Sequence, residues 1–423
     1  MNSDGLKYVL RDFVGRPLPA GLPRELQLPI DGHKVIGLSG VRRSGKTFLF
    51  FDAMRRLVEQ GVDRRAMLYL NFEDDRLHPL AAPDLDLVLR CHRELFPEVE
   101  GRLYLFLDEV QNAPGWERWV RRLHDTEQLS IFVTGSSSRV LTRDLSSAMR
   151  GRSVTLEVFP LSFREFLAFR RIDLVAFDAR QESLVRNAFV DYLHQGGFPE
   201  VVLADASMRP LILEEYASVM LVRDLGERVG IRNEGLMRAL LRHCFRNTST
   251  LVNISKLDRD FRSLGLEFGK ATLFEYMRLL EEAGLVFLLP VHEPSVRKQA
   301  RNPKKLHVID TGLVAAFLPG ATRDVGHKLE TCVFLECRRR SRQWHYMPGL
   351  GEIDLVDAEG LTLVNSCWNL TEPSTIEREA QAMAAAAEQL PGAEGRLLYH
   401  EHGADVDQRF PGAMPAWRWL LGG

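Results

Sequence analysis

The sequence lacks an excess of charge of either sign, with 55 Lys and Arg against 57 Asp and Glu and a formal net charge of −2. Attraction of the whole protein to nucleic acid or to a membrane is therefore not expected, and such binding would need a local patch. Only five residues are cysteine and none form a C-x-x-C pair, so we expect reduced thiols rather than a disulfide framework. No apolar run approaches the ~18 residues of a membrane span, and the polar first twelve residues predict no signal peptide. We expect a cytoplasmic protein that does not enter membranes.

One short segment carries a strong functional signal. The residues Gly40-Val41-Arg42-Arg43-Ser44-Gly45-Lys46-Thr47 match the phosphate-loop pattern G-x-x-x-x-G-K-[ST] in full. An apolar run at 35–38 precedes them and helix-like residues 47–60 follow, so loop N–H groups and a helix N-terminus would converge on one anion. Lys46 would reach the β- and γ-phosphates, and Thr47 would hold Mg²⁺. The candidate nucleotide-binding residues are Gly40, Arg43, Ser44, Gly45, Lys46, Thr47 and Phe48.

Two carboxylates follow a second apolar run. Residues 103–107 read Leu-Tyr-Leu-Phe-Leu, and Asp108 and Glu109 come directly after them. A continuous apolar run suits a strand buried on both faces of a parallel sheet, which would place both acids at its carboxyl end, where α/β sheets bind ligands. We expect Asp108 to support the Mg²⁺ shell and Glu109 to orient or deprotonate the attacking water. The alternative is a strand that simply ends in solvated acids.

Two more apolar runs, 66–72 and 129–133, fit the same sheet. The second run ends in Thr134-Gly135-Ser136-Ser137-Ser138. Hydroxyl groups at a strand end beside the acids can sense the γ-phosphate or hold the water, and we favour Thr134 or Ser136 for this role. The alternative is an ordinary serine-rich turn. The catalytic candidates in this part of the chain are therefore Lys46, Glu109 and Thr134.

Taken together, these segments resemble a large bacterial and archaeal group of AAA-type P-loop ATPases with an uncharacterised C-terminal domain. The resemblance runs over nearly the whole chain and rests on GVRRSGKT, YLNFEDDRL, FLDEVQNAPGWERWVRRL, IFVTGSSSRVL, RGRSVTLEVFPLSFREFL and GGFPEVV. It implies an α/β fold with ATP and Mg²⁺ as ligands. A P-loop NTPase core with a parallel sheet (1–158) would be followed by a helical segment (159–230), a winged helix-turn-helix (231–317) and a small restriction-endonuclease-like α/β domain (318–423).

ATPases of this kind usually need an arginine that stabilises charge on the leaving phosphate, often from a neighbouring subunit. The candidates are Arg139, Arg150, Arg152, Arg223 and Arg228. We favour Arg152, because Arg150-Gly151-Arg152 lies in a motif that the family shares. The alternative for each is a surface arginine or a local ion pair. An arginine supplied by another copy would make the protein a dimer or a larger homo-oligomer.

The middle of the chain changes character. Residues 160–230 indicate helices, with a capping box at Ser162 and a break at Gly196-Gly197-Phe198-Pro199. Residues 233–310 indicate three helices and a hairpin, an order that resembles a winged helix-turn-helix. Thr272, Glu275 and Arg278 would be exposed on its recognition helix. The wing, 295–307, carries five cations without an acid and would contact the phosphates of double-stranded DNA. These cations are Arg297, Lys298, Arg301, Lys304 and Lys305. The alternatives are a solvated basic hairpin and a winged helix that contacts protein.

The C-terminal segment departs from the nuclease pattern that the resemblance implies for it. Restriction-endonuclease-like sites need an acid on a helix, an Asp that ends one strand, and an acid-x-Lys on the next. The chain offers Glu330 and Glu336 on the helix and Asp354 on the first strand, but Asn365 and Cys367 stand at the acid and lysine positions. Asn is a neutral and weak Mg²⁺ ligand, and Cys gives no stable cation. We expect a nuclease fold without nuclease chemistry.

Three functions are compatible with these features. The first is an ATP-hydrolysing switch or motor that couples Mg·ATP turnover to the winged-helix and C-terminal parts and acts on DNA or on a protein partner. The second is a nucleotide-regulated signalling or defence scaffold that self-assembles. The third, an ATP-gated Mg²⁺-dependent nuclease, is disfavoured by Asn365 and Cys367.

Overall fold

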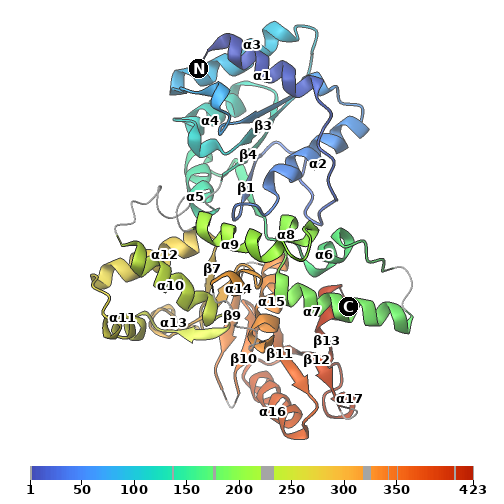
Figure 1. The fold of residues 1–423 in the computed structure, drawn as a ribbon, viewed down its shortest axis with the longest axis vertical. Coiled ribbons are helices and arrows are strands. Elements are labelled where there is room, and N and C mark those ends of the chain that lie inside the picture. Colours follow the sequence, from blue (N-terminus) through green and yellow to red (C-terminus); the bar gives the residue numbers. More distant parts are fainter. Residues whose placement is uncertain are drawn as a thin grey trace. The chain divides into compact units, whose positions relative to one another are not determined.

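The computed structural model describes residues 2–135, 138–174, 178–220, 233–317, 325–341, 343–349, 351–403 and 406–422. The chain divides into two compact units (Figure 1). The first comprises residues 1–159 with 282–284, and the second comprises 160–281 with 285–423. Across the described ranges, no helix combines the length and the apolar character that crossing a membrane requires.

The first unit is built on a five-stranded parallel sheet in the order β2-β3-β4-β1-β5. This confirms the α/β fold predicted from the apolar runs. Its strands are β1 (Val35–Ser39), β2 (Met67–Asn71), β3 (Leu103–Asp108), β4 (Leu129–Thr134) and β5 (Ser153–Glu157). Its helices are α1 (Ser3–Gly15), α2 (Lys46–Glu59), α3 (Leu87–Leu95), α4 (Trp116–Thr126) and α5 (Ser138–Met149).

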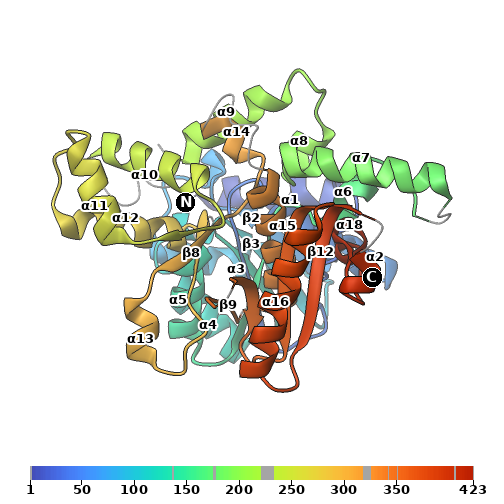
Figure 2. The ribbon, with the colours of Figure 1, turned by 90° about the horizontal axis from the view of Figure 1, so that it is seen from below.

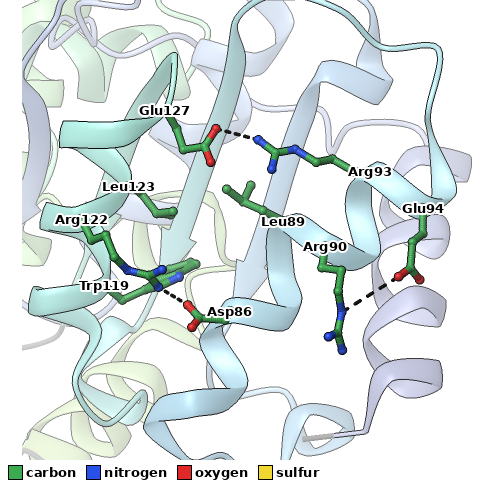
Figure 3. Close-up of a pocket in the computed structure, with 9 residues that line it drawn as sticks. All are labelled: Asp86, Leu89, Arg90, Arg93, Glu94, Trp119, Arg122, Leu123 and Glu127. Carbon is green, nitrogen blue, oxygen red and sulfur yellow. Dashed lines mark hydrogen bonds and ion pairs between the residues drawn. The ribbon is translucent and has the colours of Figure 1, made fainter.

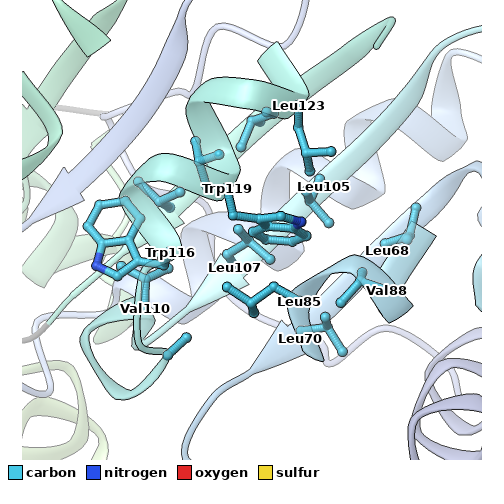
Figure 4. Close-up of a cluster of buried hydrophobic side chains, with 14 of the residues drawn as sticks. Leu68, Leu70, Leu85, Val88, Leu105, Leu107, Val110, Trp116, Trp119 and Leu123 are labelled. Carbon is cyan, nitrogen blue, oxygen red and sulfur yellow. The ribbon is translucent and has the colours of Figure 1, made fainter. Parts of the chain in front are cut away.

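Alternation along the strands separates two apolar layers of this unit. Leu105 and Leu107 of β3 belong to a cluster with side chains of α1, α3, α4 and α5, among them Trp116 and Trp119 (Figure 4). Phe106 points to the other face, where its ring stacks on Phe132 at 4.7 Å and α2 covers the sheet. Because helices cover both faces, the strands are apolar on both sides and polar groups gather at their ends.

The second unit begins with helices α6 (Phe163–Phe169), α7 (Ala179–Gln195), α8 (Pro199–Leu203) and α9 (Arg209–Val219). The predicted capping box at the start of α6 is present, since Ser162 Oγ accepts from the Glu165 N–H and Glu165 Oε2 accepts from the Ser162 N–H. Four further helices and an antiparallel sheet in the order β6-β8-β7 follow. These elements are α10 (Glu234–Arg246), β6 (Thr250–Val252), α11 (Ile254–Ser263), α12 (Lys270–Glu282), β7 (Val286–Leu289), α13 (Val296–Arg301) and β8 (Lys304–Val308).

The expected hairpin at 295–307 is wrong in one respect. Residues 296–301 form the helix α13, and only the residues from Lys304 onward form a strand, β8, which pairs with β7 and β6. Ser295 caps the helix by accepting from the Lys298 N–H, and four helix-compatible residues, Arg297-Lys298-Gln299-Ala300, follow the cap.

The C-terminal part of the second unit holds a five-stranded mixed sheet in the order β13-β12-β11-β10-β9, with α15 and α16 packed on β11 (Figure 1). In Figure 2, α16 lies beside β12 of the same sheet. Its strands are β9 (Trp344–Met347), β10 (Ile353–Asp357), β11 (Thr362–Leu370), β12 (Glu394–His402) and β13 (Met414–Pro415). Its helices are α14 (Leu313–Phe317), α15 (Val325–Arg340), α16 (Pro373–Gln389), α17 (Val406–Arg409) and α18 (Ala416–Leu420).

The double glycine that interrupts the helical pattern has a packing role within this unit. Gly196 has φ +75° and ψ −166°, a region essentially reserved for glycine, and a Cβ there would overlap the carboxylate of Asp310. The Asp310 carboxylate accepts from the N–H groups of Gly197 at 2.7 Å and Gly312 at 2.8 Å. The glycines thus let the end of α7 lie directly against the turn that follows β8.

Candidate functional site

The segment Gly40–Thr47 forms the turn between β1 and α2 that the motif predicts. Gly40 has φ +153° and a Cβ there would overlap the Val158 carbonyl oxygen, while Gly45 has φ +98° and precedes the first residue of α2. Both positions therefore require glycine. The Ser44 side chain is fully buried, and its Oγ has no hydrogen-bond partner among the described residues. An unpaired buried hydroxyl inside an anion-type loop is a group that a bound phosphate would satisfy.

Lys46 folds back over this loop. Its side chain is 5% exposed, and Nζ donates to the carbonyl oxygens of Gly40 at 2.9 Å and Val41 at 3.0 Å. Phe48, next but one along α2, is 51% exposed, and its ring makes an edge contact with Phe51. The loop thus holds its cation close to its own carbonyl groups and leaves an aromatic ring at its rim.

Asp108 is the point at which three elements of the first unit meet. Its carboxylate accepts from Thr47 Oγ1 of α2 at 2.7 Å, from Tyr69 Oη of β2 at 3.1 Å, and from Thr134 Oγ1 at the end of β4. The side chain is 2% exposed, and burial raises the pKa of its carboxyl above the ordinary value. A desolvated carboxylate tied to the phosphate-loop threonine is the donor set that a divalent cation would use.

Glu109 directly follows Asp108 and has a left-handed backbone conformation. Its φ is +52°, and its backbone N–H donates to Thr134 Oγ1 at 3.2 Å. Its half-buried carboxylate accepts from Gln111 Nε2. Thr134 therefore contacts both predicted acids, donating its proton to Asp108 and accepting from the backbone of Glu109. The structure brings Lys46, Thr47, Asp108, Glu109 and Thr134 to the carboxyl end of neighbouring strands. Ser136, the other sensor candidate, lies outside the described residues.

Two residues near this site gave no signal in the sequence. Tyr69 lies inside β2, where aromatic residues are common, and only the pairing of β2 with β3 places its hydroxyl beside Asp108. Arg24 precedes β1, and its guanidinium donates to the carbonyl oxygens of Ser44 at 2.8 Å and Phe159 at 2.9 Å. It thereby holds the phosphate loop against the segment after β5. Arg42 and Arg43 also lie in the loop, and Arg42 pairs with Glu73 at 3.1 Å.

The favoured arginine is not at the phosphate loop of its own chain. Arg152 precedes β5, its carbonyl accepts from the Val35 N–H at the start of β1, and its guanidinium lies 3.4 Å from Asp125. β1 and β5 run parallel, so Arg152 lies at the amino end of these strands and Gly40 at their carboxyl end. At ~3.3 Å per residue the two ends are about 16 Å apart. Arg150 lies on the same side. Within one chain Arg152 therefore does not complete the site, and action on another copy stays a prediction. The Arg139 side chain, Arg223 and Arg228 lie outside the described residues.

The predicted DNA-contacting residues divide into two groups. Arg297, Lys298 and Arg301 of α13 are exposed and Lys304 is half-buried. Lys305 was expected on the same surface, and this is wrong, because its side chain is 2% exposed and lies between carboxylates of the C-terminal part. Lys305 lies in β8, where the residues from Lys305 to Val308 are all buried. On α12, Glu275 and Arg278 are exposed and Thr272 is half-buried.

The C-terminal candidates also separate. Glu330 and Asp354 both contact Lys305, whereas Glu336 pairs with Arg339 at 3.2 Å and Arg340 at 3.0 Å. Asn365 is 2% exposed, and Cys367 is half-buried with its thiol donating to the Asn369 carbonyl. Of the two helix acids, only Glu330 therefore shares a site with Asp354.

A cavity of about 460 Å³ lies between α3 and α4 of the first unit (Figure 3). Its charged lining is internally paired, with Arg93 at 2.6 Å from Glu127 and Arg122 bonded to Asp86. Its helices cover the sheet face opposite to α2, and its lining contains no phosphate-loop residue. The cavity is therefore separate from the site around Asp108.

Comparisons with known proteins agree with a phosphate-loop domain in the first unit. Residues 32–167 match an AAA domain family, and residues 186–324 match a family described as a domain of unknown function, DUF8612. The protein MJ1544 of Methanocaldococcus jannaschii, described as uncharacterised, is 30% identical over 420 residues, covering 94% of this chain and 90% of that protein. An uncharacterised Haemophilus influenzae protein is 29% identical, covering 75% of this chain and 76% of that protein.

Among solved structures, the Aeropyrum pernix ORC1 protein in complex with DNA matches with a TM-score of 0.29 and 14% identity, over 75% of this chain and 92% of that one. Caenorhabditis elegans PCH-2 matches with a TM-score of 0.28 and 14% identity, over 50% of this chain and 61% of that one.

Proposed function

This chain belongs to the same family as MJ1544 of Methanocaldococcus jannaschii, and from its AAA domain and site geometry we propose that it is an ATP-binding and ATP-hydrolysing switch. The observation that carries the proposal is the shared carboxylate of Asp108, which accepts from Thr47 and Thr134 while Glu109 follows it in the chain. One cluster thus contains a candidate metal-binding pair and a candidate water-activating acid at the end of the phosphate loop. The four-domain organisation expected from the sequence, with boundaries after residues 158, 230 and 317, is part of this proposal.

The residues present fit Mg²⁺ and a nucleoside triphosphate. The buried Ser44 hydroxyl without a described partner and the glycine-only turns at Gly40 and Gly45 suit phosphate oxygens. Thr47 and Asp108 would hold Mg²⁺, which when bound neutralises charge on the β- and γ-phosphate oxygens. Arg43, Lys46 and Phe48 would contribute the remaining contacts to the nucleotide.

The protein's own residues then divide the work. Asp108 remains buried and fixed by its three donors, so it holds one position as charge develops nearby. Glu109, which is half-buried and follows Asp108 in the chain, would orient a water molecule or accept its proton. Thr134 would set the position of Glu109 relative to Asp108, since it bonds to both. An arginine such as Arg152 of another copy would complete the charge stabilisation, which makes a homo-oligomer the expected active form.

The test is hydrolysis and binding measured on the same variants. Lys46→Ala should abolish nucleotide binding, and Glu109→Gln should retain binding and lower kcat by about 100-fold or more, because the amide cannot take a proton. Gln111→Ala removes the amide that donates a hydrogen bond to the Glu109 carboxylate and leaves the phosphate loop unchanged. It serves as the matched control. Hydrolysis by Glu109→Gln at the wild-type rate would contradict the assignment.

A DNA partner is the more specific of two candidates for what the switch acts on. The exposed Arg297, Lys298 and Arg301 on α13 favour it, because three cations on one short helix suit backbone phosphates. Mg·ATP hydrolysis should rise with double-stranded DNA and fall back in a variant with all three changed to Glu, and the stimulation should weaken with salt. A rate indifferent to DNA, with ATP-dependent assembly, would instead support the protein-binding scaffold.

A further inference from the structure

A buried ammonium group lies among three carboxylates in the second unit. Lys305 Nζ of β8 lies 2.5 Å from Glu330 Oε1 of α15, 2.6 Å from Glu352 Oε1 and 2.9 Å from Asp354 Oδ1 of β10. The lysine side chain is 2% exposed, and the side chains of Glu330 and Asp354 are 11% and 14% exposed. Glu330 comes from α15, whereas Asp354 lies in β10 and Glu352 directly precedes that strand, and all three acids converge on one cation.

The groups around this cluster leave few free acceptors. The second oxygen of Asp354 accepts from the Ser366 N–H at 2.9 Å and from Ser366 Oγ at 3.1 Å. Asn365 Oδ1 accepts from the Asp354 N–H at 2.9 Å, and its amide nitrogen donates to the Glu352 carbonyl at 3.1 Å and to Glu379 at 2.9 Å. Asn365 therefore works as a bridge between β10, β11 and α16 rather than as a ligand.

Electrostatics and space both favour the lysine as the occupant. Burial by itself lowers the pKa of Lys305, but the carboxylates of Asp354, Glu330 and Glu352 outweigh this and raise it, so the amine stays charged. A Mg²⁺ ion needs carboxylate oxygens at about 2.1 Å. An ion at that distance from these oxygens would lie in the space that Nζ holds. Within the described part of the chain, no group of three or more His, Cys, Asp or Glu is placed to hold a metal ion.

We propose that the Lys305 ammonium is the permanent cation of the Glu330, Glu352 and Asp354 cluster, in the place where a divalent metal would otherwise bind. The lysine ties β8 to β10 and α15 and closes the site to metal. This region then serves as a metal-independent structural or binding domain. The proposal is independent of ATP hydrolysis, since it concerns a cluster that shares no residue with the phosphate loop.

Lys305→Met tests this, because it keeps an unbranched side chain, ends one atom short of the Nζ position and removes the charge. Bound Mn²⁺ is measured on the full chain by the electron paramagnetic resonance signal of the free ion, with Lys305→Met/Asp354→Asn as the matched control. Any Mn²⁺ at the phosphate loop is common to both proteins and cancels. We expect Lys305→Met to unfold at a lower temperature than wild type, to bind about one more Mn²⁺ than the control, and to regain part of the lost stability with Mn²⁺.

Wild-type protein should bind no more Mn²⁺ than Glu352→Gln, whose altered side chain lies at the more open edge of the cluster at 36% exposure. This second comparison decides the question if Lys305→Met fails to fold. Mn²⁺ bound by wild type and lost in Glu352→Gln would overturn the proposal. A folded Lys305→Met protein that gains no Mn²⁺ over its control would overturn it as well.

Discussion

Replacing Thr134 by Val isolates the link between the two acids of the candidate ATPase site. Val has the shape of Thr without the hydroxyl, and the side chain is fully buried, so the change removes hydrogen bonds and little else. Two bonds are lost, one to the Asp108 carboxylate and one from the Glu109 N–H. Asp108 keeps its bonds from Thr47 and Tyr69. Nucleotide binding should therefore change less than about threefold, because the phosphate loop and its threonine are untouched.

Hydrolysis should suffer more than binding. A hydrogen bond to a charged group contributes about 1.5–3 kcal/mol and a neutral one about 0.5–1.5 kcal/mol. If most of the energy of the bond to the charged Asp108 carboxylate acts through the placement of Glu109, kcat should fall by about 10- to 100-fold. This conversion uses about 1.36 kcal/mol of activation free energy for each tenfold change in rate. The assay is steady-state Mg·ATP hydrolysis together with fluorescence titration of a nucleotide analogue, with circular dichroism to verify folding.

Two matched variants make this test specific. Thr134→Ser keeps the hydroxyl and should restore most of the rate. Tyr69→Phe removes a bond to the same carboxylate but none to Glu109, so its kcat should stay within about threefold of wild type. The reasoning is refuted if Thr134→Val hydrolyses as fast as wild type, or if Tyr69→Phe is impaired to the same extent. Equal losses in binding and in kcat would also refute it, since they would place Thr134 at the nucleotide.

The remaining predictions concern the double-glycine turn. Gly196→Ala should lower the free energy of unfolding by about 3–6 kcal/mol, because it combines a glycine-only conformation with displacement of the buried Asp310 carboxylate; Gly265→Ala, at φ +80° with open space, should cost only about 1 kcal/mol in the same urea titration. Burial raises the pKa of Asp310 from 3.8 to about 6, so between these pH values the folded state binds a proton that the unfolded state has lost. The free energy of unfolding should therefore fall by about 3 kcal/mol as the pH rises from 4 to 6. The difference between the urea midpoints of wild type and of Asp310→Asn should decline in the same way from pH 4 to 6. A difference that stays constant would mean that Asp310 does not titrate in this range.

Patterns that lie within a few consecutive residues could be predicted from the sequence. The apolar runs gave the strands of the parallel sheet, and the capping box at Ser162 marked the start of α6. The α/β class followed because these runs alternate with helical segments. The segment after Ser295 is different, since its charges indicated a solvated hairpin, whereas the structure has the helix α13 there, capped by Ser295.

The sequence alone determined that Gly40–Thr47 forms a phosphate loop and that acids end the strand at Asp108, because both depend on local backbone geometry and on the side-chain alternation of one strand. Only the tertiary structure decided which hydroxyl groups reach Asp108, since Tyr69 and Thr134 meet it through pairing between strands far apart in the chain. Tertiary packing likewise turned Lys305 from an expected DNA contact into a buried counter-ion. The charge of a residue is written in the sequence, but its exposure depends on neighbours that only the folded chain assembles.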